Sequence, residues 1–422
     1  MNRPAEGLGR PRAEVPPTAG LPLRLADLAW PRHAADADLG AALARFIGVD
    51  AVQIECSGTA AFTVALSALR RLAPGRNEVV VPAYTCPLVA LAVARCGLRL
   101  RLCDLAAGSL DLDPAHLASL CHAGTPAVVP THLGGRVSDV ATALACARAV
   151  GAWTIEDAAQ ALGAQAGGHS VGTAADIGFF SLAAGKGLSI FEGGALVARD
   201  PALAAACRQA SAATVPGRPA WELRRSAELL GYAAFYRPGG LGLVYGRPLR
   251  RALQRGDRVA AAGDDFDLPF PLHRPGRWRQ AVGVKALGRL PRFLAEGRER
   301  ARARAARLSG IAGLQVMTDS AAVPGAAGVW PLMMVMLPNE VSRDAALAQL
   351  WGAGCGVSLP FVHALPDYPH YTEVVPSAAP NELPHARALA ARMLAVSNSP
   401  WLDDERFEWV CRVLGAYASR AL

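Results

Sequence analysis

Lysine is nearly missing from this sequence: only Lys186 and Lys285 occur among 43 basic residues, and all the others are arginine. A guanidinium stays charged, so arginine cannot serve where a reaction needs a deprotonated amine. The two lysines are either present by chance, or one of them is kept because a reaction needs its amine. They are therefore the first candidates for a reactive nitrogen.

Metal-binding and membrane-spanning patterns are also missing. The nine cysteines form no CxxC pair and show no zinc-like spacing to histidine, so no metal site is predicted. The longest apolar stretch, Leu229–Leu249, is interrupted by arginine, proline and five glycines, and the N-terminus lacks the apolar core of a secretion signal. Scattered thiols in odd number are typical of a reducing compartment. These features predict a cytoplasmic protein without an integral membrane segment.

The basic charge does not indicate a nucleic-acid partner. The net charge is +8, but the arginines are spread along the chain and no basic motif with interleaved aromatic residues accompanies them. Solvated helix faces explain the arginines better.

A chain of 422 residues exceeds the size of a typical single core, which predicts more than one domain. We expect a flexible N-terminal arm over residues 1–24, a large domain over 25–262, and a bridging helix with a smaller C-terminal domain over 263–422. The Gly/Pro-rich stretch within 237–248 is expected to be a loop.

Short apolar runs alternate with helix-length segments between Ala51 and Ala198, which is typical of an α/β sheet with crossover helices. Seven strands are predicted: Ala51–Cys56, Glu78–Pro82, Leu98–Asp104, Ala127–Thr131, Ala152–Glu156, Ile177–Ser181 and Gly194–Ala198. Helices are predicted between and after them: Thr59–Arg71, Leu88–Cys96, Pro114–Cys121, Asp139–Val150, Pro201–Ala213 and Ala220–Ala234.

The second half of the sequence predicts a smaller α+β unit that follows a long helix. The pattern Arg277–Leu308 is helical with an interruption near Pro291. Three strands (Leu314–Thr318, Val329–Leu337, Val357–Leu359) and two helices (Asp344–Trp351, His385–Leu394) are predicted after it.

Three groups of polar residues lie at predicted strand ends, where open α/β sheets bind ligands. Ser57-Gly58-Thr59 opens a helix and can cradle a phosphate, or simply cap the helix. Asp157 ends an apolar strand, and Gln160 follows three residues later. A carboxylate buried at the end of such a strand needs a partner, which could be a protonated ring nitrogen or the cation of a salt bridge. Lys186 stands between two glycines just past a strand, whereas Lys285 lies in a helical pattern.

The order and spacing of these blocks resemble the DegT/DnrJ/EryC1/StrS aminotransferases, the sugar aminotransferases of pyridoxal-phosphate fold type I. The matching segments are Ser57–Thr59, Val81–Thr85, Thr131–Gly134, Ile155–Gln160, Gly172 to Asp176, Phe180–Ser181, Lys186 and Glu192–Gly194. The resemblance implies an aspartate-aminotransferase-like fold with a seven-stranded, mostly parallel sheet, flanking helices and a smaller C-terminal α+β domain.

The resemblance also implies roles for individual residues. Lys186 would bind pyridoxal 5'-phosphate covalently, and Asp157 would pair with its ring nitrogen. Gln160 would contact the ring oxygen, while Gly58, Thr59 and Ser181 would hold the phosphate.

Two positions depart from the family pattern. Cys86 stands where an aromatic residue usually stacks on the ring, with Tyr84 two residues before it. His273–Arg277 stands where an asparagine usually reaches a neighbouring subunit's phosphate.

The activity implied is amino transfer from an amino acid, glutamate or glutamine, to the keto group of a nucleotide-linked sugar in polysaccharide or secondary-metabolite biosynthesis. A homodimer is implied as well. Elimination by a lyase or dehydratase uses the same residues. A serine hydrolase with Ser170 in Gly168–Gly172, and a non-catalytic regulator that binds the cofactor, are also compatible with the sequence.

Overall fold

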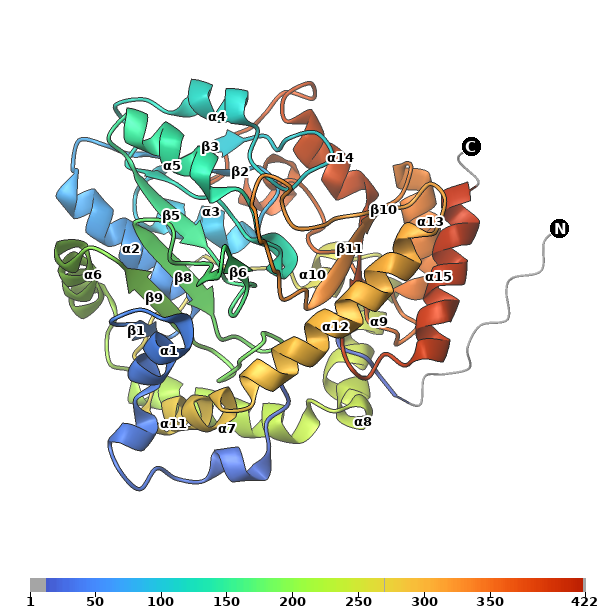
Figure 1. Ribbon diagram of the computed structural model, residues 1–422, viewed down its shortest axis with the longest axis horizontal. Helices are drawn as coiled ribbons and strands as arrows, with labels where there is room; N and C mark the ends of the chain where they lie inside the picture. The colour runs from blue at the N-terminus through green and yellow to red at the C-terminus, as the bar shows by residue number, and fades with distance from the viewer. Residues whose placement is uncertain (1–12, 269, 420–422) are drawn as a thin grey trace.

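The computed structural model describes residues 13–268 and 270–419 and has a seven-stranded sheet at its centre (Figure 1). The strand order is β1-β9-β8-β5-β4-β2-β3. Each strand overlaps one predicted apolar run: β1 (Gln53–Glu55), β2 (Glu78–Pro82), β3 (Arg99–Cys103), β4 (Ala127–Val128), β5 (Trp153–Asp157), β8 (Ile177–Ser181) and β9 (Gly194–Ala198).

The sheet is mostly parallel, as predicted. Strands β3, β2, β4, β5 and β8 pair in parallel, and β9 is antiparallel to both β8 and β1. The carboxyl ends of β2, β4, β5 and β8 therefore meet at one edge of the sheet, where the site residues lie.

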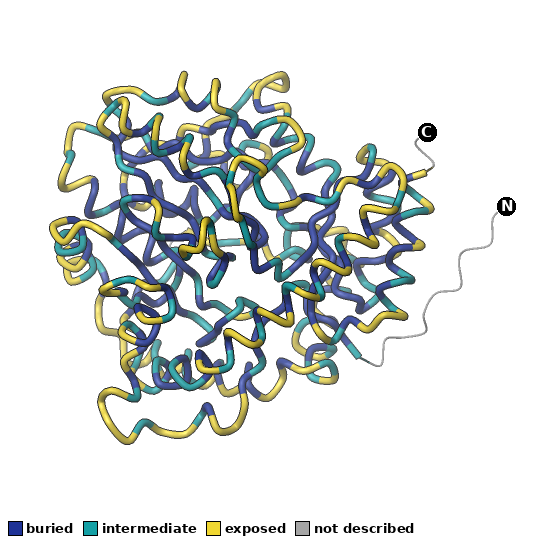
Figure 2. The backbone as a smooth tube through the Cα atoms, viewed as in Figure 1, coloured by how far each residue is buried: buried dark blue, intermediate teal, exposed yellow. Residues whose placement is uncertain are grey.

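Side chains that alternate along the strands enter two different apolar cores. Phe179 and Leu196 belong to one buried cluster, whereas Phe180 and Ala195 belong to the other. Strands buried on both faces need apolar residues at successive positions, which explains the uninterrupted apolar runs of the sequence. Figure 2 shows the sheet as a buried layer inside partly exposed helices.

The helices around the sheet begin with recognisable caps. Asp113, Asp139 and Asp200 each accept a hydrogen bond from a backbone N–H in the first turn of the following helix. The helices are α2 (Gly58–Leu72), α3 (Pro87–Arg95), α4 (Pro114–Leu120), α5 (Val140–Ala149), α6 (Pro201–Thr214) and α7 (Pro219–Phe235), and α1 (Leu39–Ile47) precedes them.

The start of α2 lies against β8 and β9 with no room for extra side-chain atoms. A Cβ atom added to Gly194 would lie 2.1 Å from the Ser57 carbonyl oxygen, and one added to Gly58 would lie 2.9 Å from Cβ of Ser181. Both glycines are thus required by close backbone approach. This contact brings the N-terminus of α2 next to the end of β8.

A second, four-stranded sheet forms the C-terminal half, with the order β10-β11-β13-β12 and antiparallel pairing. Helices α11 (Arg277–Leu287) and α12 (Leu290–Ser309) lead into it, and α12 runs diagonally across the molecule in Figure 1. Its elements are β10 (Gln315–Val316), β11 (Leu332–Met336), α13 (Glu340–Leu350), β12 (Val357–Ser358), α14 (Pro384–Arg392), β13 (Met393–Ser397) and α15 (Asp404–Ala418).

The predicted helix His385–Leu394 is wrong at its end. Helix α14 stops at Arg392, and Met393 begins β13, which pairs with both β11 and β12. A short apolar run directly after a helix cannot be separated from it by periodicity alone.

The loop expected within residues 237–248 is also wrong. This stretch is helical: α8 (Pro238–Leu241), the π-helical η4 (Gly242–Gly246) and α9 (Arg247–Gln254) follow one another, and α10 (Arg258–Ala262) comes next. Leu241 and Leu249 are buried. Tertiary packing of these apolar residues overrides the low helix propensity of the four glycines in this stretch.

The flexible arm expected over residues 1–24 needs a correction. Residues 1–12 lie outside the described residues, but residues 14–23, which we term the N-terminal strap, are packed. The Val15 N–H donates to the Gly354 carbonyl at 3.0 Å and the Ala19 N–H donates to the Pro331 carbonyl at 2.9 Å. The domain boundary at residue 262 stays a prediction.

Among the described residues, no helix has both the length and the apolar composition needed to cross a membrane.

Candidate active site

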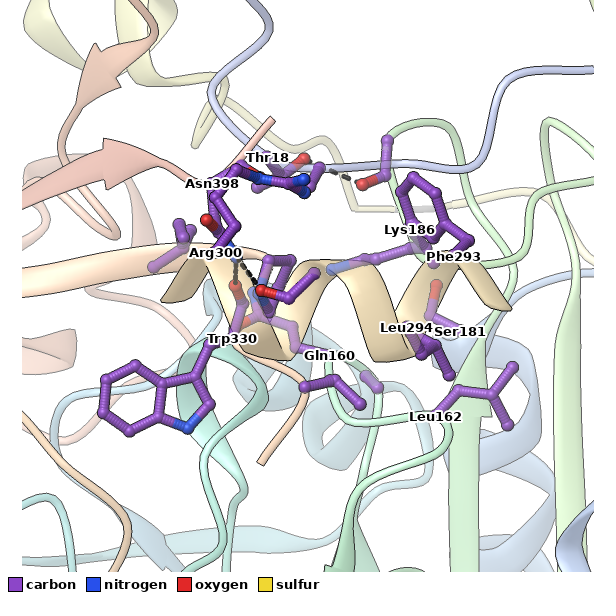
Figure 3. Close-up of a pocket in the computed structure, with 18 residues that line it drawn as sticks. Thr18, Gln160, Leu162, Ser181, Lys186, Phe293, Leu294, Arg300, Trp330 and Asn398 are labelled. Carbon is purple, nitrogen blue, oxygen red and sulfur yellow. Dashed lines mark hydrogen bonds between the residues drawn. The ribbon is translucent and has the colours of Figure 1, made fainter. Parts of the chain in front are cut away.

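Lys186 lies in a loop that follows β8 and is anchored on both sides. The carbonyl of Gly185 accepts a hydrogen bond from the Thr18 hydroxyl at 2.8 Å, and the carbonyl of Gly187 accepts one from the Leu21 N–H at 3.1 Å. Gly185 adopts a left-handed φ of 77°. The N-terminal strap therefore fixes the backbone from which the lysine projects into a cavity (Figure 3).

Asp157 is a buried acid at the end of β5, the strand that pairs in parallel with β8. It ends β5 with 5% of its surface exposed, and its Oδ1 accepts a hydrogen bond from the Ala159 N–H at 3.0 Å. Burial raises the pKa of the Asp157 carboxyl to about 6, against the lowering effects of the Ala159 N–H and of the Lys186 charge. Burial likewise lowers the pKa of the Lys186 amine, although Cys86 and Asp157 oppose this. Burial thus disfavours the charge of each group, while each group's charge partly offsets this effect on the other.

The neighbouring acid, Glu156, faces the other side of β5 and has a structural role. Its carboxylate accepts hydrogen bonds from the backbone N–H groups of Gly172, Ala174 and Ala175, and it pairs with Nε2 of His132 at 2.8 Å. Although burial alone would raise it, the His132 contact and these N–H groups hold the pKa of Glu156 below its usual value. Strand alternation therefore leaves only Asp157 for the site.

Gly58, Thr59 and Ser181 meet where the start of α2 touches the end of β8. The Ser57 hydroxyl accepts a hydrogen bond from the Ala60 N–H at 3.0 Å and so caps α2. The remaining first-turn N–H groups of α2 have no partner within the helix, and the absence of a side chain at Gly58 keeps them open. The Ser181 side chain lies against Gly58, and N–H groups at a helix N-terminus are suited to bind an anion.

Gln160 follows Asp157 and lines the same cavity. Its Oε1 accepts a hydrogen bond from the Gly134 N–H at 2.6 Å. This contact fixes the orientation of the amide and leaves its nitrogen as the donor for a ligand.

The structure separates the two residues proposed for ring stacking. Cys86 caps α3, and burial raises the pKa of its thiol to about 12, with Lys186 and Asp157 among the charges acting on it. Tyr84 packs edge-on against Phe361 at 5.7 Å, and its hydroxyl donates to the Phe361 carbonyl at 3.2 Å. Tyr84 therefore lies in the contact with the C-terminal half, and a role of Cys86 at the cofactor stays a prediction.

The cavity has walls from both halves of the chain. Lys186, Gln160 and Ser181 come from the large sheet, whereas Arg300 comes from α12. The other lining residues are Thr18, Ala19, Ala159, Leu162, Gly185, Gly187, Phe293, Leu294, Gly297, Val329, Trp330, Pro331, Leu332 and Asn398. Sequence reasoning missed Arg300 because it is one of many arginines in a helical pattern, and nothing in the sequence distinguishes it from its neighbours.

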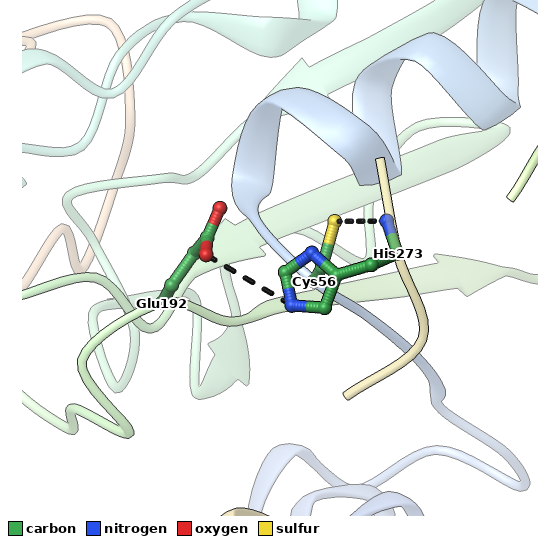
Figure 4. Close-up of side chains that lie close together, drawn as sticks. All are labelled: Cys56, Glu192 and His273. Atoms are coloured by element: carbon green, nitrogen blue, oxygen red, sulfur yellow. Dashed lines mark hydrogen bonds and ion pairs between the residues drawn. The ribbon is translucent and has the colours of Figure 1, made fainter. Parts of the chain in front are cut away.

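Cys56, Glu192 and His273 form a separate buried cluster, in which one ligand atom from each lies within 4.8 Å of the others (Figure 4). The cluster already contains positive charge, because Arg279 lies 3.2 Å from Nε2 of His273 and Arg225 pairs with Glu192. Burial raises the pKa of the Cys56 thiol to about 12 and lowers that of His273 to about 4. Neutral Cys56 and His273 beside two guanidinium groups make a structural network, and His273 is fully buried within its own subunit.

The geometry around Ser170 does not match a serine hydrolase. Ser170 lies in the small hairpin of β6 (Gln165–Ala166) and β7 (His169–Ser170), and its hydroxyl donates to the Val171 carbonyl at 3.0 Å. A nucleophile elbow needs a strand before the serine and a helix after it. Here Ser170 instead lies in β7, a short strand that pairs antiparallel with the short strand β6 before it.

An amine, a desolvated carboxylate and an anion cradle at the carboxyl ends of one α/β sheet are the donor set of a pyridoxal-phosphate enzyme of fold type I. The buried carboxylate fits a cationic ring nitrogen, and the cradle fits a phosphate. The model of the DegT/DnrJ/EryC1/StrS aminotransferase family matches residues 34–234 and 278–415, so the chain belongs to that family. Residues 235–277, which include α8, α9 and α10, lie outside the match.

Individual relatives support the same family. Protein MosB of Rhizobium meliloti is 40% identical over 38% of this chain and 31% of its own length. GDP-perosamine synthase of Caulobacter vibrioides is 36% identical over 40% of this chain and 44% of its own length, so these matches span less than half of either curated relative. The crystal structure of 3-amino-5-hydroxybenzoic acid synthase has the same fold, with a TM-score of 0.67, 20% identity, and coverage of 95% of this chain and 100% of its own.

The raised pKa of Asp157 predicts how the stability of the cofactor-free protein depends on pH. The folded chain holds this proton more tightly than the unfolded chain, so stability falls as pH rises from about 4 to about 6. Asp157→Asn removes the buried charge, and at pH 8 the variant should be more stable than the parent by roughly 1–3 kcal/mol. Urea unfolding at pH 8 and at pH 4 measures the difference, which should disappear at the lower pH.

Asp50→Asn is the matched control, because Asp50 is exposed. It should leave stability unchanged at both pH values. An Asp157→Asn variant that is less stable than the parent at pH 8 would show that the carboxylate already has a satisfactory partner without the cofactor.

Proposed function

We propose that the protein is a pyridoxal-phosphate-dependent aminotransferase that moves an amino group from an amino acid to the keto group of a nucleotide-linked sugar. The observation that carries the proposal is the placement of Lys186 and Asp157 at the carboxyl ends of two neighbouring parallel strands, since Asp157 ends β5 and Lys186 follows β8. Pyridoxal phosphate is the cofactor that the family indicates. When bound, it supplies an aldehyde that bonds to amines and a cationic ring that withdraws electrons.

The residues then have distinct tasks. Burial lowers the pKa of the Lys186 amine, which favours its neutral form, so Nζ would hold the cofactor and, when free, could accept a proton from the substrate carbon and return it. The Asp157 carboxylate would keep the ring nitrogen charged. Gln160 would orient the ring through its amide, and Gly58, Thr59 and Ser181 would hold the phosphate.

We further propose glutamate or glutamine as the amino donor and polysaccharide or secondary-metabolite biosynthesis as the setting. The names of the relatives support a sugar acceptor, since one synthesises GDP-perosamine. Elimination by the same residues would release a product that contains no new nitrogen, so the products distinguish the two outcomes.

The purified protein should be yellow, and borohydride should fix the cofactor on Lys186, because this lysine lines the cavity at the strand ends. Lys285→Arg is the matched control, since Lys285 is the only other lysine and contacts the Ala29 carbonyl at the surface. Peptide mass spectrometry should find the label on Lys186 in both the parent and Lys285→Arg. Lys186→Arg should fold normally, carry no label and lose amino transfer by at least about 10³-fold. Label on Lys285, or turnover retained in Lys186→Arg, would refute the assignment.

A screen of keto-sugar nucleotides with glutamate or glutamine should identify an acceptor to which the amino nitrogen is transferred. Nitrogen-15 in the donor should appear in the sugar product, as mass spectrometry can measure. A deoxygenated product without the label would support elimination. No reaction with any keto-sugar, together with reaction of a non-sugar ketone, would overturn the proposed substrate class.

We propose that the chain works as a homodimer that buries α7. Leu223 is 74% exposed and Leu230 is 49% exposed, and the two lie seven residues apart on one face of this helix. Phe235 at the end of the same helix is 41% exposed. Apolar side chains that gather on one exposed helix face are typical of a subunit interface.

The double change Leu223→Glu and Leu230→Glu should convert the dimer to a monomer, because it places charges in the proposed apolar contact. Light scattering after size-exclusion chromatography measures the mass. Val341→Glu, which changes a side chain 79% exposed on α13, should leave the mass unchanged. A parent protein that is monomeric, or a double variant that remains dimeric, would contradict this interface.

A further inference from the structure

Positive charge is concentrated around the helices α8 and α9. Residues 229–256 contain five arginines and no aspartate or glutamate. Among the described residues, Arg250 is the one arginine of the five with an ion pair, since its Nη1 lies 2.9 Å from the Glu14 carboxylate. The other four are exposed: Arg237, Arg247, Arg251 and Arg255. This part of the surface therefore carries a positive charge that the described chain does not neutralise.

Three of these arginines lie along one side of a continuous helical run. Helix α8, the π-helical η4 and helix α9 follow one another from residue 238 to residue 254. Buried Leu249 and Ala252 turn one side of the run toward the core. Arg247, Arg251 and Arg255 recur every four residues on the exposed side, and we term them the basic stripe. The stripe is about 12 Å long, at the rise of about 1.5 Å per residue of a helix.

The basic stripe is unfavourable for the isolated chain. Like charges four residues apart on a helix are neighbours and repel each other. Residues 229–256 provide no acidic side chain at the same spacing that would offset this repulsion. Anions that bind from outside would remove the repulsion, and a row of three cations matches an extended array of anions better than one small anion.

Two exposed aliphatic side chains adjoin the basic stripe. Leu243 is 47% exposed and Val244 is 49% exposed, and Leu243 lies about one helical turn before Arg247. Aliphatic residues beside a row of cations are typical of a helix that lies on a bilayer, where the apolar side chains enter the interface and the cations contact anionic head groups. A nucleic acid gives no comparable place to this pair. Proteins that bind single strands use exposed aromatic residues, but the aromatic residue of this run, Tyr245, packs against the apolar cores.

We propose that α8, η4 and α9 form a docking surface for a membrane that contains anionic phospholipids. Leu243 and Val244 enter the interface between head groups and acyl chains, and the basic stripe contacts the head groups. The docking is peripheral, because the opposite side of the run stays packed on the core through Leu249 and Ala252. The surface lies within residues 235–277, outside the match to the family model. The proposal is therefore independent of the amino transfer proposed above.

Co-sedimentation of the full chain with lipid vesicles tests this surface. The parent should bind vesicles of phosphatidylcholine that contain about one third phosphatidylglycerol, but not vesicles of phosphatidylcholine alone, and about 0.5 M salt should release it. The triple change Arg247→Gln, Arg251→Gln and Arg255→Gln should weaken binding about 100-fold. Its thermal midpoint should be equal to or higher than that of the parent, because the change removes like-charge repulsion. A parent that does not bind the mixed vesicles would overturn the proposal.

A second triple variant separates the stripe from the net charge of the protein. Arg71→Gln, Arg148→Gln and Arg302→Gln remove the same charge from three exposed positions on α2, α5 and α12. This variant should bind the mixed vesicles nearly as the parent does, because salt screens charges outside the contact. Equal weakening in both triple variants would overturn the proposal, since binding would then follow net charge alone.

The double change Leu243→Ser and Val244→Ser distinguishes a lipid surface from other polyanions, because it keeps every charge. It should weaken binding to the mixed vesicles about 10-fold, as the apolar side chains no longer enter the interface. Light scattering should give the same mass for this variant as for the parent. Unchanged vesicle binding would overturn the lipid assignment, as would tighter binding of the parent to DNA than to the mixed vesicles at the same salt concentration.

Discussion

The site depends on one electrostatic constraint: a carboxylate that the fold keeps dry without giving it a full set of partners. Asp157 receives one backbone hydrogen bond, whereas Glu156 beside it receives three backbone N–H groups and a histidine. A buried acid left in this condition attracts any cation that can reach it. The same burial acts on the Lys186 amine, so the fold weakens both charges in the space where a cofactor would lie.

The N-terminal strap and α12 join the two halves of the chain around this pair. Thr18 and Leu21 hold the carbonyls on both sides of Lys186, while Ala19 bonds to the C-terminal half at Pro331. Helix α12 contributes Arg300 to the same cavity. Lys186 and Arg300 are thus carried by different elements, which packing and the hydrogen bonds of the strap hold together.

Much of this arrangement could be predicted, for definite physical reasons. The central strands could be predicted because strands buried on both faces require apolar runs, whereas β3 alternates exposed arginine with buried leucine. Lys186 was noticed because lysine is so rare in the chain. Arg300 could not be singled out from the sequence, because arginine is common in the chain. Whether a given arginine is buried depends on residues far away in the sequence. Strand β13 and the helices α8 and α9 escaped prediction because tertiary contacts, rather than local pattern, decide their conformation. Tyr84 and Cys86 could be separated only once the contact with Phe361 was known.

The strap also has a consequence for the order in which the molecule is assembled. Arg406 donates a hydrogen bond to the Ala13 carbonyl, 393 residues away along the chain, and Val15 pairs with Cys355 in the second half. During synthesis the segment that secures the Lys186 loop therefore leaves the ribosome long before its partners and must wait until residues as far along as Cys355 and Arg406 have emerged. The large sheet can form early, yet a competent pocket is completed only by one of the last and longest-range contacts, which are slow to close.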